Sequence, residues 1–577
     1  MLKIQRVIIL GFCFLIFACG GGGSGDTNTV ELPQSPDPDV LHTLSGTPAT
    51  SVNEDEEYAF QVTVNNSDND PLTFSLDNAP SWLSISNTGL VSGMANTDAD
   101  TGIFADIVIS ATDNKQNTVS LPAFTLSVYA VNDTAIITLE NSSFSADGRS
   151  TFTIPYTIED EENSASISLE GLENFISYTV LQTEIEITVA DINEVISDTI
   201  TMVAGNGADA SRASIELQLY PMNASGLGRT IKGKREGSGV HLLILGDGYQ
   251  ETELSTYEAD AFKFIDILYS DPDISEHLSV WNVHVVNMPS NDSGIDDTYN
   301  TDTADTVFNS GYNCQNIQRL ICANTSTVFA TLADEYPWAG EVVLIVNSEQ
   351  YGGSGGAISI YNRTSPEIAL HEMGHSFASL ADEYVDSQLA DDRAQSYVQG
   401  RYANVSNSND PLDAPWAHWI DDLENYPSAA GETGVGVFEG SYYNATGFYR
   451  PQYDSRMRSN NANFGPVNAE QWLLNTYAGA GGAINEVSPE SATINLTSGE
   501  SISLSAVPTF NVHVQNISWF LNGDALNNEA GNESISLTLA QGTHSVVVSL
   551  NDATGKIRTS DYSYIHEESF EWTITVD

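Results

Sequence analysis

The sequence predicts a multidomain chain in which a central α/β domain is flanked by β-sandwich domains. The chain has 577 residues, which is too many for one ordinary domain. Residues 43–225 and 485–577 are filled by short runs of period-two alternation broken by turn residues, which is typical of β-sandwiches. Between residues 228 and 480, continuous apolar runs alternate with helical stretches, which indicates buried strands in an α/β core.

The first 19 residues predict an export signal. Lys3 and Arg6 form a basic segment, and residues 7–17 form an apolar run that is too short to span a bilayer comfortably. The run ends in Ile16-Phe17-Ala18-Cys19, which resembles a bacterial lipobox. That resemblance implies that Cys19 carries lipid; a plain signal peptide with an incidental cysteine is the alternative.

Residues 20–42 are rich in Gly, Pro, Asp and Ser, and we expect them to form a flexible linker. Residues 20 and 21 are both Gly, so no Asp follows Cys19. In lipoproteins this points away from retention in the inner membrane. We therefore expect an exported outer-membrane or cell-surface lipoprotein, with a periplasm-facing anchor as the other placement, and membrane contact through the lipid only.

Acidic residues dominate the composition. The chain has 78 acidic and 19 basic residues and a formal net charge of −59. Such a surface repels phosphate, so nucleic-acid binding is excluded as a function class. Carboxylates suit calcium, which prefers hard oxygen ligands. The alternative is that the charge keeps an exported protein soluble.

The four cysteines separate into two groups. Cys13 leaves with the signal and Cys19 is the lipidation candidate. Cys314 and Cys322 remain, and in an oxidising compartment a pair this close predicts a local disulfide. Two free buried thiols are the alternative.

The first predicted sandwich covers residues 43–131. Residues 58–64, 107–112 and 124–128 alternate with period two. The stretch that begins Pro80-Ser81-Trp82-Leu83 resembles bacterial cadherin-like and immunoglobulin-like repeats, as does the exit at residues 130–134. In cadherin-like modules acidic loops hold calcium, and the candidates here are Glu54, Asp68, Asp70, Asp113 and Asp133. Ordinary turns closed by Asp side chains are the alternative.

Two further sandwiches are expected, at residues 132–225 and 485–577, on the same periodicity. The central domain, residues 228–480, has three apolar strands at residues 240–245, 281–287 and 341–347. The first ends at Gly246 and is followed by a helical stretch that reaches Leu268.

The candidate metal site lies on a helix predicted from Pro366 to about Leu380. Ser365 suits the N-cap and Pro366 the first turn. His371 and His375 are four residues apart, so their imidazoles share one face and can reach one metal ion. Glu372 is then placed to act as the general base toward a zinc-activated water.

A third protein ligand must follow, with one position left open. In the metzincin pattern this ligand comes after a glycine-assisted turn, at the position of Ala381, which cannot bind metal. Asp382 is preferred and Glu383 is the second choice; the unused carboxylate would orient a histidine N–H. Alternatively, both carboxylates cap the helix end or pair with arginine.

The central region resembles the IgA-peptidase family of zinc metalloendopeptidases. The similarity rests on the run from His371 to Tyr384 and on four further segments in the same order: residues 245–249, 289–296, 346–356, and Tyr449-Arg450-Pro451 with Ser455-Arg456-Met457. Ser379 departs from the pattern, which more often has Gly there. The resemblance implies a zincin-like α/β fold, Zn²⁺ and endopeptidase activity, without implying that IgA is the substrate.

Three other features bear on the site. Residues 341–347 and the Gly-rich run that follows Tyr351 predict an edge strand and a pliable rim to which an extended substrate could add; a loop needing unusual dihedral angles is the alternative. By comparison with metzincins Met457 is a candidate Met-turn beneath the metal, or a simple core residue. Tyr449 or Tyr453 is a candidate oxyanion donor, or simple packing.

We therefore expect a surface-anchored zinc endopeptidase that hydrolyses proteins or peptides. A non-catalytic, calcium-dependent adhesin is the alternative, and a carbohydrate-directed surface protein a third hypothesis. The intact set of His371, Glu372 and His375 favours the enzyme. The sequence gives no indication of oligomeric state.

Overall fold

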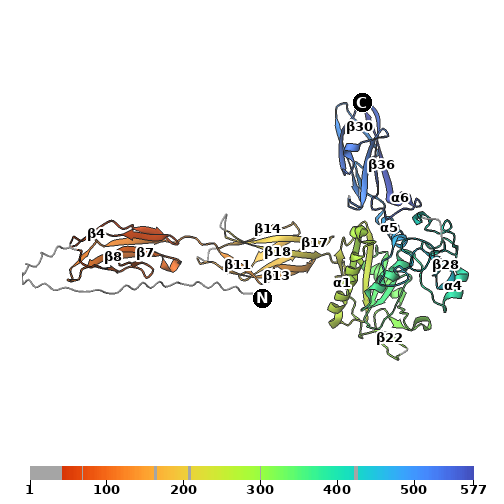
Figure 1. Ribbon diagram of the computed structural model, residues 1–577, viewed down its shortest axis with the longest axis horizontal. Coiled ribbons are helices and arrows are strands. Elements are labelled where there is room, and N and C mark those ends of the chain that lie inside the picture. The colour runs from red at the N-terminus through yellow and green to blue at the C-terminus, as the bar shows by residue number, and fades with distance from the viewer. Residues whose placement is uncertain are drawn as a thin grey trace, which may run out of the picture. The chain divides into compact units, whose positions relative to one another are not determined.

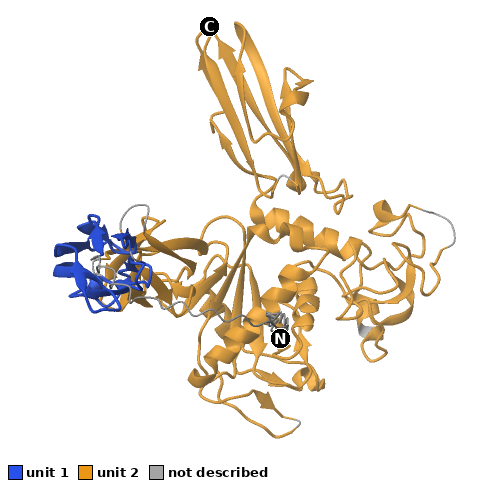
Figure 2. Cartoon of the chain, turned by 60° about the vertical axis from the view of Figure 1, so that its left-hand side comes forward, with its two compact units in different colours: residues 1–133, 160–164 blue, residues 134–159, 165–577 orange. Residues whose placement is uncertain are grey.

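The computed structural model describes residues 42–67, 69–161, 165–205, 210–298, 300–421, 426–511 and 513–577. The predicted signal with Cys13 and Cys19, and the calcium candidate Asp68, lie outside the described residues. The chain forms two compact units, Met1–Asp133 with Asp160–Ser164, and Thr134–Glu159 with Ala165–Asp577 (Figure 2). In the part of the chain described, no helix has the length and apolarity needed to cross a bilayer.

The first unit is a β-sandwich (Figure 1). One sheet has the order β2-β10-β8-β5 with β9 on β8, a second has β3-β7-β6, and β1 pairs with β4. Alternate residues of the strands point inward, so Tyr58, Val91, Ile107 and Leu126 meet in one core. The strands are β1 Thr43–Ser45, β2 Ser51–Asn53, β3 Glu57–Gln61, β4 Thr63–Asn65, β5 Thr73–Asp77, β6 Ser84–Ile85, β7 Leu90–Met94, β8 Gly102–Thr112, β9 Thr118–Ser120 and β10 Phe124–Tyr129.

The second unit begins with another sandwich. Its two sheets have the orders β11-β13-β16-β15 and β12-β18-β17-β14. Ile154 and Ile187 from one sheet pack against Ile200 and Leu217 from the other. The strands are β11 Ile136–Leu139, β12 Ser143–Asp147, β13 Thr151–Glu159, β14 Ile167–Glu170, β15 Ile176–Val180, β16 Glu184–Val189, β17 Ile196–Ala204 and β18 Ser211–Tyr220.

The central domain is a six-stranded sheet covered by helices on both faces. The strand order is β19-β21-β20-β24-β26-β25; β21, β20, β24 and β26 are parallel, and the edge strands β19 and β25 are antiparallel. Successive residues of β20 serve different cores: Leu242 and Ile244 pack with helices α1 and α3, while Leu243 and Leu245 pack with α2. This explains why the strand is continuously apolar.

The bounds of the elements in the central domain are as follows. The strands are β19 Gly228–Lys232, β20 Val240–Asp247, β21 Trp281–Val286, β22 Asp296–Asp297, β23 Gly311–Tyr312, β24 Glu341–Val346, β25 Gly353–Ser354, β26 Ser359–Asn362, β27 Phe438–Ser441 and β28 Asn444–Arg450. The helices are α1 Leu254–Ser270, α2 Thr325–Glu335, α3 Pro366–Ser376, α4 Ala390–Ser396 and α5 Pro466–Ala480.

Two expectations about this domain were wrong. The strand at Glu341–Val346 is not an edge strand, because β20 and β26 pair with its two sides; the edge next to the metal helix is β25, the short strand of the Gly-rich run. Helix α3 ends at Ser376, four residues before Leu380. The chain leaves the helix there because Ser379 adopts the left-handed conformation, with φ of 53°.

The C-terminal sandwich has sheets of order β29-β31-β34 and β30-β36-β35-β32-β33. The predicted fold class, a multidomain chain with sandwiches flanking an α/β domain, is confirmed. Its elements are β29 Ile484–Ser488, β30 Thr493–Leu496, β31 Ser501–Pro508, β32 Gln515–Leu521, β33 Asp524–Ala525, β34 Ser534–Thr538, β35 Gly542–Asp552, α6 Ser563–His566 and β36 Glu567–Val576.

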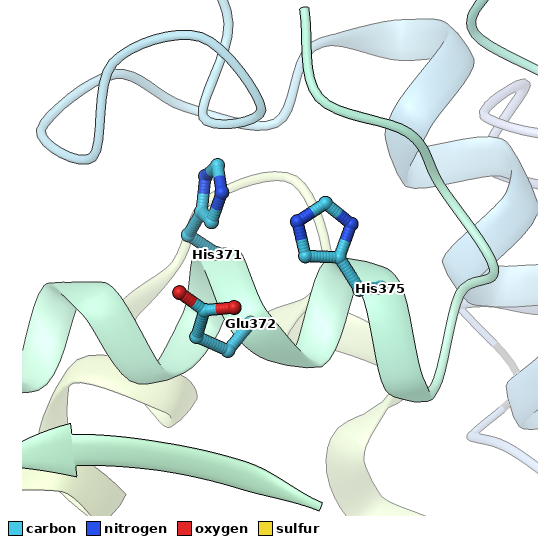
Figure 3. Close-up of side chains that lie close together, drawn as sticks. All are labelled: His371, Glu372 and His375. Atoms are coloured by element: carbon cyan, nitrogen blue, oxygen red, sulfur yellow. The ribbon is translucent and has the colours of Figure 1, made fainter. Parts of the chain in front are cut away.

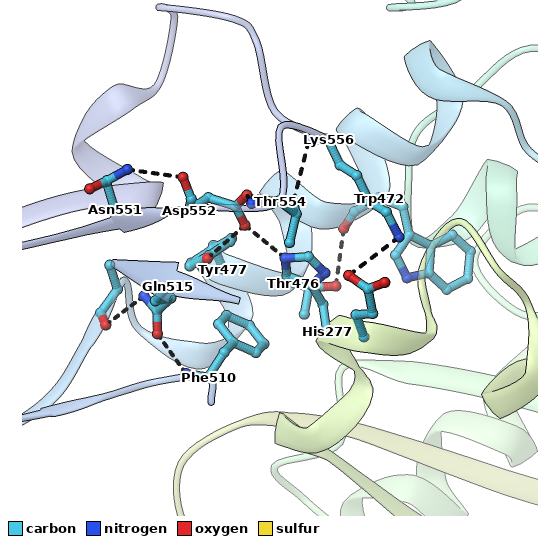
Figure 4. Close-up of polar contacts among 12 residues, drawn as sticks. His277, Trp472, Thr476, Tyr477, Phe510, Gln515, Asn551, Asp552, Thr554 and Lys556 are labelled. Carbon is cyan, nitrogen blue, oxygen red and sulfur yellow. Dashed lines mark hydrogen bonds and ion pairs between the residues drawn. The ribbon is translucent and has the colours of Figure 1, made fainter. Parts of the chain in front are cut away.

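Helix α5 fixes this sandwich to the central domain. Tyr477, near the end of α5, is buried in the apolar core of the sandwich. The carboxylate of Asp552 accepts hydrogen bonds from Tyr477 Oη at 2.9 Å and from His277 Nε2 at 2.8 Å (Figure 4). Burial by itself would raise the pKa of Asp552, but the hydrogen bonds from His277 and Thr554 hold it below its ordinary value.

Candidate metal centre and active site

Helix α3 carries the candidate site because its two faces differ. Ile368, Ala369, Leu370 and Met373 pack into the core against α1 and the sheet. Ser365 is the N-cap by position, although its side chain makes no capping bond, and Pro366 is in the first turn. The other face presents His371, Glu372 and His375 to a cavity of about 950 Å³.

Both imidazoles project from the same side of α3, and the Glu372 carboxylate lies next to them (Figure 3). The ligating atoms of the three side chains lie within 4.8 Å of one another. The ring planes of His371 and His375 are at 89° and their centroids are 5.0 Å apart. The spacing of four residues therefore brings the two imidazoles to one point, as the sequence predicts.

Backbone carbonyls fix the tautomer of each histidine. His371 Nδ1 lies 2.8 Å from the carbonyl oxygen of Arg456, and His375 Nδ1 lies 2.9 Å from that of Leu380. Because a carbonyl only accepts, each Nδ1 carries the hydrogen, and each Nε2 is free to bind a metal ion. Both Nε2 atoms face Asp382.

The structure places Asp382 at the third position. Its Oδ1 atom is 3.0 Å from His371 Nε2 and 3.2 Å from His375 Nε2. Its Oδ2 atom accepts a hydrogen bond from the hydroxyl of Tyr443. Three donors of the N, N, O type around one point, with a cavity on the open side, fit a zinc ion that keeps its fourth position for substrate or water.

The charges of His371, His375, Glu372 and Asp382 depend on one another. Burial would raise the pKa of Asp382, but the two histidines hold it well below its ordinary value. Burial would lower the pKa of His375, but Asp382 and Glu372 raise it to about 9. The two nitrogens and the carboxylate therefore share protons that a divalent ion would displace.

The turn that delivers Asp382 is closely specified. Leu380 N donates to the carbonyl oxygen of Gly374 at 2.8 Å. The side chain of Asn404 bonds to both backbone groups of Ala381, at 2.9 Å to its N and 2.8 Å to its O. With Ser379 in the left-handed region, these bonds turn the chain back across the histidines.

The alternative third ligand, Glu383, is not brought to the histidines. Its carboxylate is fully buried and accepts from Asn404, Asn468 and Ser455 at 3.0, 2.9 and 2.6 Å. Burial raises the pKa of Glu383, and these hydrogen bonds oppose that shift. Adjacent side chains of an extended segment point in opposite directions, so only one of the two carboxylates can face the metal position.

Met457 lies directly beneath the metal helix. A β-carbon on Gly374 would be 2.4 Å from Met457 Sδ, and Met457 is fully buried. The carbonyl oxygen of Met457 accepts from Glu383 N at 2.8 Å. The segment Arg456–Met457 thus touches a histidine, the floor of the helix and the turn that carries Asp382.

The two tyrosines named as oxyanion candidates lie elsewhere. Tyr449 is buried in an apolar cluster with Trp416 and Trp419, and Tyr453 packs against Phe438 and Arg450. Neither lines the cavity. Tyr384 and Tyr443 do line it, and sequence reasoning missed the role of both; the position of Tyr384 two residues after Asp382 was the available signal.

The Gly-rich rim lies so close to the side chains of helix α3 that a larger residue would not fit at Gly355. A β-carbon on Gly355 would lie 2.5 Å from Glu372 Oε2 and 3.0 Å from His375 Cδ2. Burial raises the pKa of Glu372, against the lowering effect of the two histidines.

Cys314 and Cys322 form the predicted disulfide. The loop that this disulfide closes contacts strand β25, where Gly353 N donates to the carbonyl oxygen of Arg319 at 3.1 Å.

The calcium candidates in the first unit have several local partners. Asp113 Oδ1 accepts from Lys115 N and Asn117 N at 2.9 and 2.8 Å, which closes a turn. Asp70 lies 2.9 Å from Lys115 Nζ. Glu54 is buried and accepts from Val131 N at 3.3 Å. Asp113 thus closes a turn, as the alternative expects, Asp70 pairs with Lys115, and calcium binding by this module stays a prediction.

Two parts of the chain match known family models. Residues 231–432 match the family model described as IgA Peptidase M64, and residues 41–129 match that described as Putative Ig domain. No curated protein matches the sequence of this chain.

Several solved structures resemble part of the chain. Human protocadherin-24 EC1-2 (Form II) is 15% identical, with a TM-score of 0.21, over 31% of this chain and 97% of that chain. The N-terminal eight Ig domains of Down Syndrome Cell Adhesion Molecule are 12% identical, with a TM-score of 0.22, over 36% and 26%. An endo-fucoidan hydrolase from glycoside hydrolase family 107 is 14% identical, with a TM-score of 0.16, over 31% and 28%. This chain thus spans about a quarter of the length of the last two.

Proposed function

We propose that the chain is a zinc-dependent endopeptidase that hydrolyses extracellular proteins or peptides, since residues 231–432 match the family model described as IgA Peptidase M64. The observation that carries the proposal is the position of Asp382 Oδ1, at 3.0 and 3.2 Å from the Nε2 atoms of two histidines whose tautomers are already fixed. No particular protein substrate is implied.

The residues divide the work as follows. His371, His375 and Asp382 would hold the ion, and Tyr443 orients Asp382. A bound Zn²⁺ would lower the pKa of a coordinated water toward ~7 and polarise the scissile carbonyl. Glu372 accepts the proton of the attacking water and delivers it to the leaving amine. Tyr384 lines the same cavity, and its hydroxyl would be a donor for the developing oxyanion.

The proposal extends to location. Cys19 would carry the lipid that holds the exported chain at the outer membrane or cell surface, and along the sequence two β-sandwiches separate it from the catalytic domain. Incorporation of labelled palmitate into the full chain, compared with Cys19→Ser, tests this part separately.

The enzymatic part is tested with soluble residues 20–577, loaded with zinc, on unfolded casein. Glu372→Ala is the matched variant, because it removes the base and none of the three ligands. We expect one zinc per chain in both proteins, by elemental mass spectrometry, and cleavage by the parent only. Absence of both zinc and cleavage in the parent protein would contradict the proposal, as would equal cleavage by the two.

A further inference from the structure

The cavity above the metal position is richer in positive charge than the rest of the chain. Among the described residues, three of its lining side chains are arginines: Arg319, Arg393 and Arg458. Three are carboxylates: Glu367, Glu372 and Asp382. The chain as a whole has 78 acidic and 19 basic residues, so equal numbers of arginines and carboxylates in the lining are a marked local departure from the composition.

The excess of arginines over carboxylates in the lining becomes larger when the metal-site residues are left out. Asp382 and Glu372 serve the metal and the attacking water, and a divalent ion would offset their two charges. Of the carboxylates described in the lining, Glu367 then remains beside the three arginines. The large negative charge elsewhere acts weakly here, because physiological salt screens exposed charges beyond about 8 Å.

Two of the arginines are available to a ligand. Arg458 is committed, since it donates to the carbonyl oxygen of Tyr453 at 2.6 Å and lies 3.9 Å from Asp454. Arg319 and Arg393 are exposed and form no ion pair with any carboxylate whose side chain the structure describes.

These two arginines stand at the ends of one row of side chains. Arg319 and Tyr384 both line the cavity, and against the lowering effect of burial, interaction with Tyr384 raises the pKa of Arg319. The rings of Tyr384 and Tyr443 are in contact, with centroids 5.4 Å apart, and Arg393 lies over the Tyr443 ring at 5.5 Å. Since Tyr443 also bonds Asp382, the row runs along the wall of the cavity next to the metal ligand.

The backbone of Arg319 is held in place on both sides. It lies within the loop closed by the disulfide between Cys314 and Cys322. Its carbonyl oxygen accepts from Gly353 N of β25, and Ser354 Oγ donates to the nearby carbonyl oxygen of Ile321 at 2.5 Å. The segment that carries Arg319 is thus anchored, and its guanidinium offers a planar fork of donors, the geometry that matches a carboxylate.

We propose that this row binds a carboxylate of the peptide substrate, with Arg319 as the main contact and Arg393 as the second. The inference rests on the proposed peptidase function and adds a substrate class to it: peptides with an acidic group close to the scissile bond. That group is either the side chain of Asp or Glu, or the free C-terminus.

The test separates binding from cleavage. Zinc-loaded Glu372→Gln, which binds without turnover, is titrated with two fluorescent peptide mixtures that differ only in Glu or Gln at their fixed positions, each with a free or amidated C-terminus. We expect the carboxylate form to bind about 10- to 100-fold more tightly, the range for one charge-assisted contact. Dependence on the Glu side chain or on the free C-terminus identifies the source.

Arginine variants in the same Glu372→Gln background assign the effect. Arg319→Ala should reduce the preference to about onefold, Arg319→Lys should keep part of it, and Arg212→Ala on the second sandwich should keep all of it. Equal binding of all mixtures, or a preference that survives loss of both Arg319 and Arg393, overturns the inference. A carboxylate preference together with equal cleavage of casein by the parent protein and Glu372→Ala supports this inference and overturns the proposed function.

Discussion

Met457 packs so closely under Gly374 that a β-carbon on the glycine would lie 2.4 Å from the sulfur and 3.1 Å from the terminal methyl. Gly374 belongs to the helical turn between the two histidines, so this contact sets the height of the metal helix above the loop at Arg456 and Met457. The same loop accepts the hydrogen bonds from His371 and Glu383 N. The metal helix, His371 and the turn that carries Asp382 are therefore all held against the segment Arg456–Met457.

We predict that Gly374→Ala lifts α3 from this loop, lowers stability by about 1–3 kcal/mol through overpacking and weakens zinc binding. Zinc affinity by competition with a chromogenic chelator is the measurement. Adding Met457→Ala should restore part of the affinity, because it makes room for the new methyl. Wild-type affinity in the single variant would show that the contact does not position the helix.

Substitutions of the adjacent carboxylates Asp382 and Glu383 should have different effects. Asp382→Ala removes a proposed metal ligand, and we expect loss of bound zinc with the fold retained. Glu383→Ala leaves Asn404, Asn468 and Ser455 without their shared acceptor, and we expect a loss of about 2–4 kcal/mol of stability. Zinc content and denaturant unfolding of both variants measure this; the opposite pattern would make Glu383 the ligand.

Ser379 holds a conformation that suits glycine better. Its φ of 53° strains any residue that has a β-carbon, and Ser379→Gly would remove this strain. Glycine also has more freedom in the unfolded chain, which lowers stability, so we expect a net gain of about 0.5–1 kcal/mol. Ser379→Ala keeps the strain and is the matched control. Denaturant unfolding that shows Gly no more stable than Ala would contradict this reading of the turn.

Glu341 should make stability depend on pH. Burial raises its pKa from 4.5 to about 8, and a hydrogen bond from Ser376 opposes this. The folded state therefore holds a proton that the unfolded state loses, and stability falls between about pH 4.5 and 8, by at most about 1.4 kcal/mol per unit. Glu341→Gln should flatten this slope in unfolding measured across pH, and exposed Glu349→Gln should leave it unchanged.

The joint with the C-terminal sandwich should contribute to the stability of the catalytic domain. Asp552→Ala leaves His277 and Tyr477 without their common acceptor, and we expect a loss of about 1–3 kcal/mol. Asp524→Ala, on exposed strand β33 of the same sandwich, is the control. If thermal unfolding of the catalytic domain were unchanged by Asp552→Ala, the two domains would be energetically independent.

Sequence reasoning succeeded where the pattern is local. Period-two runs gave the sandwiches, an apolar run gave β20, and the spacing of His371 and His375 gave two imidazoles on one helix face. It failed where partners come from distant segments. Nothing local shows that β26 pairs with β24 and moves the sheet edge to β25, or that Tyr443 reaches Asp382 from 61 residues away. The two candidate tyrosines were chosen by sequence order, whereas packing buried one and turned the other away.

The carbonyl groups that fix the two imidazoles come from Arg456 and Leu380, and neither bond needs an ion. The protein itself therefore orients the two rings, through groups that are not metal ligands. For the proposed zinc enzyme we therefore expect the imidazoles to keep their orientation when the ion is removed, so that returned zinc finds its ligands already in place.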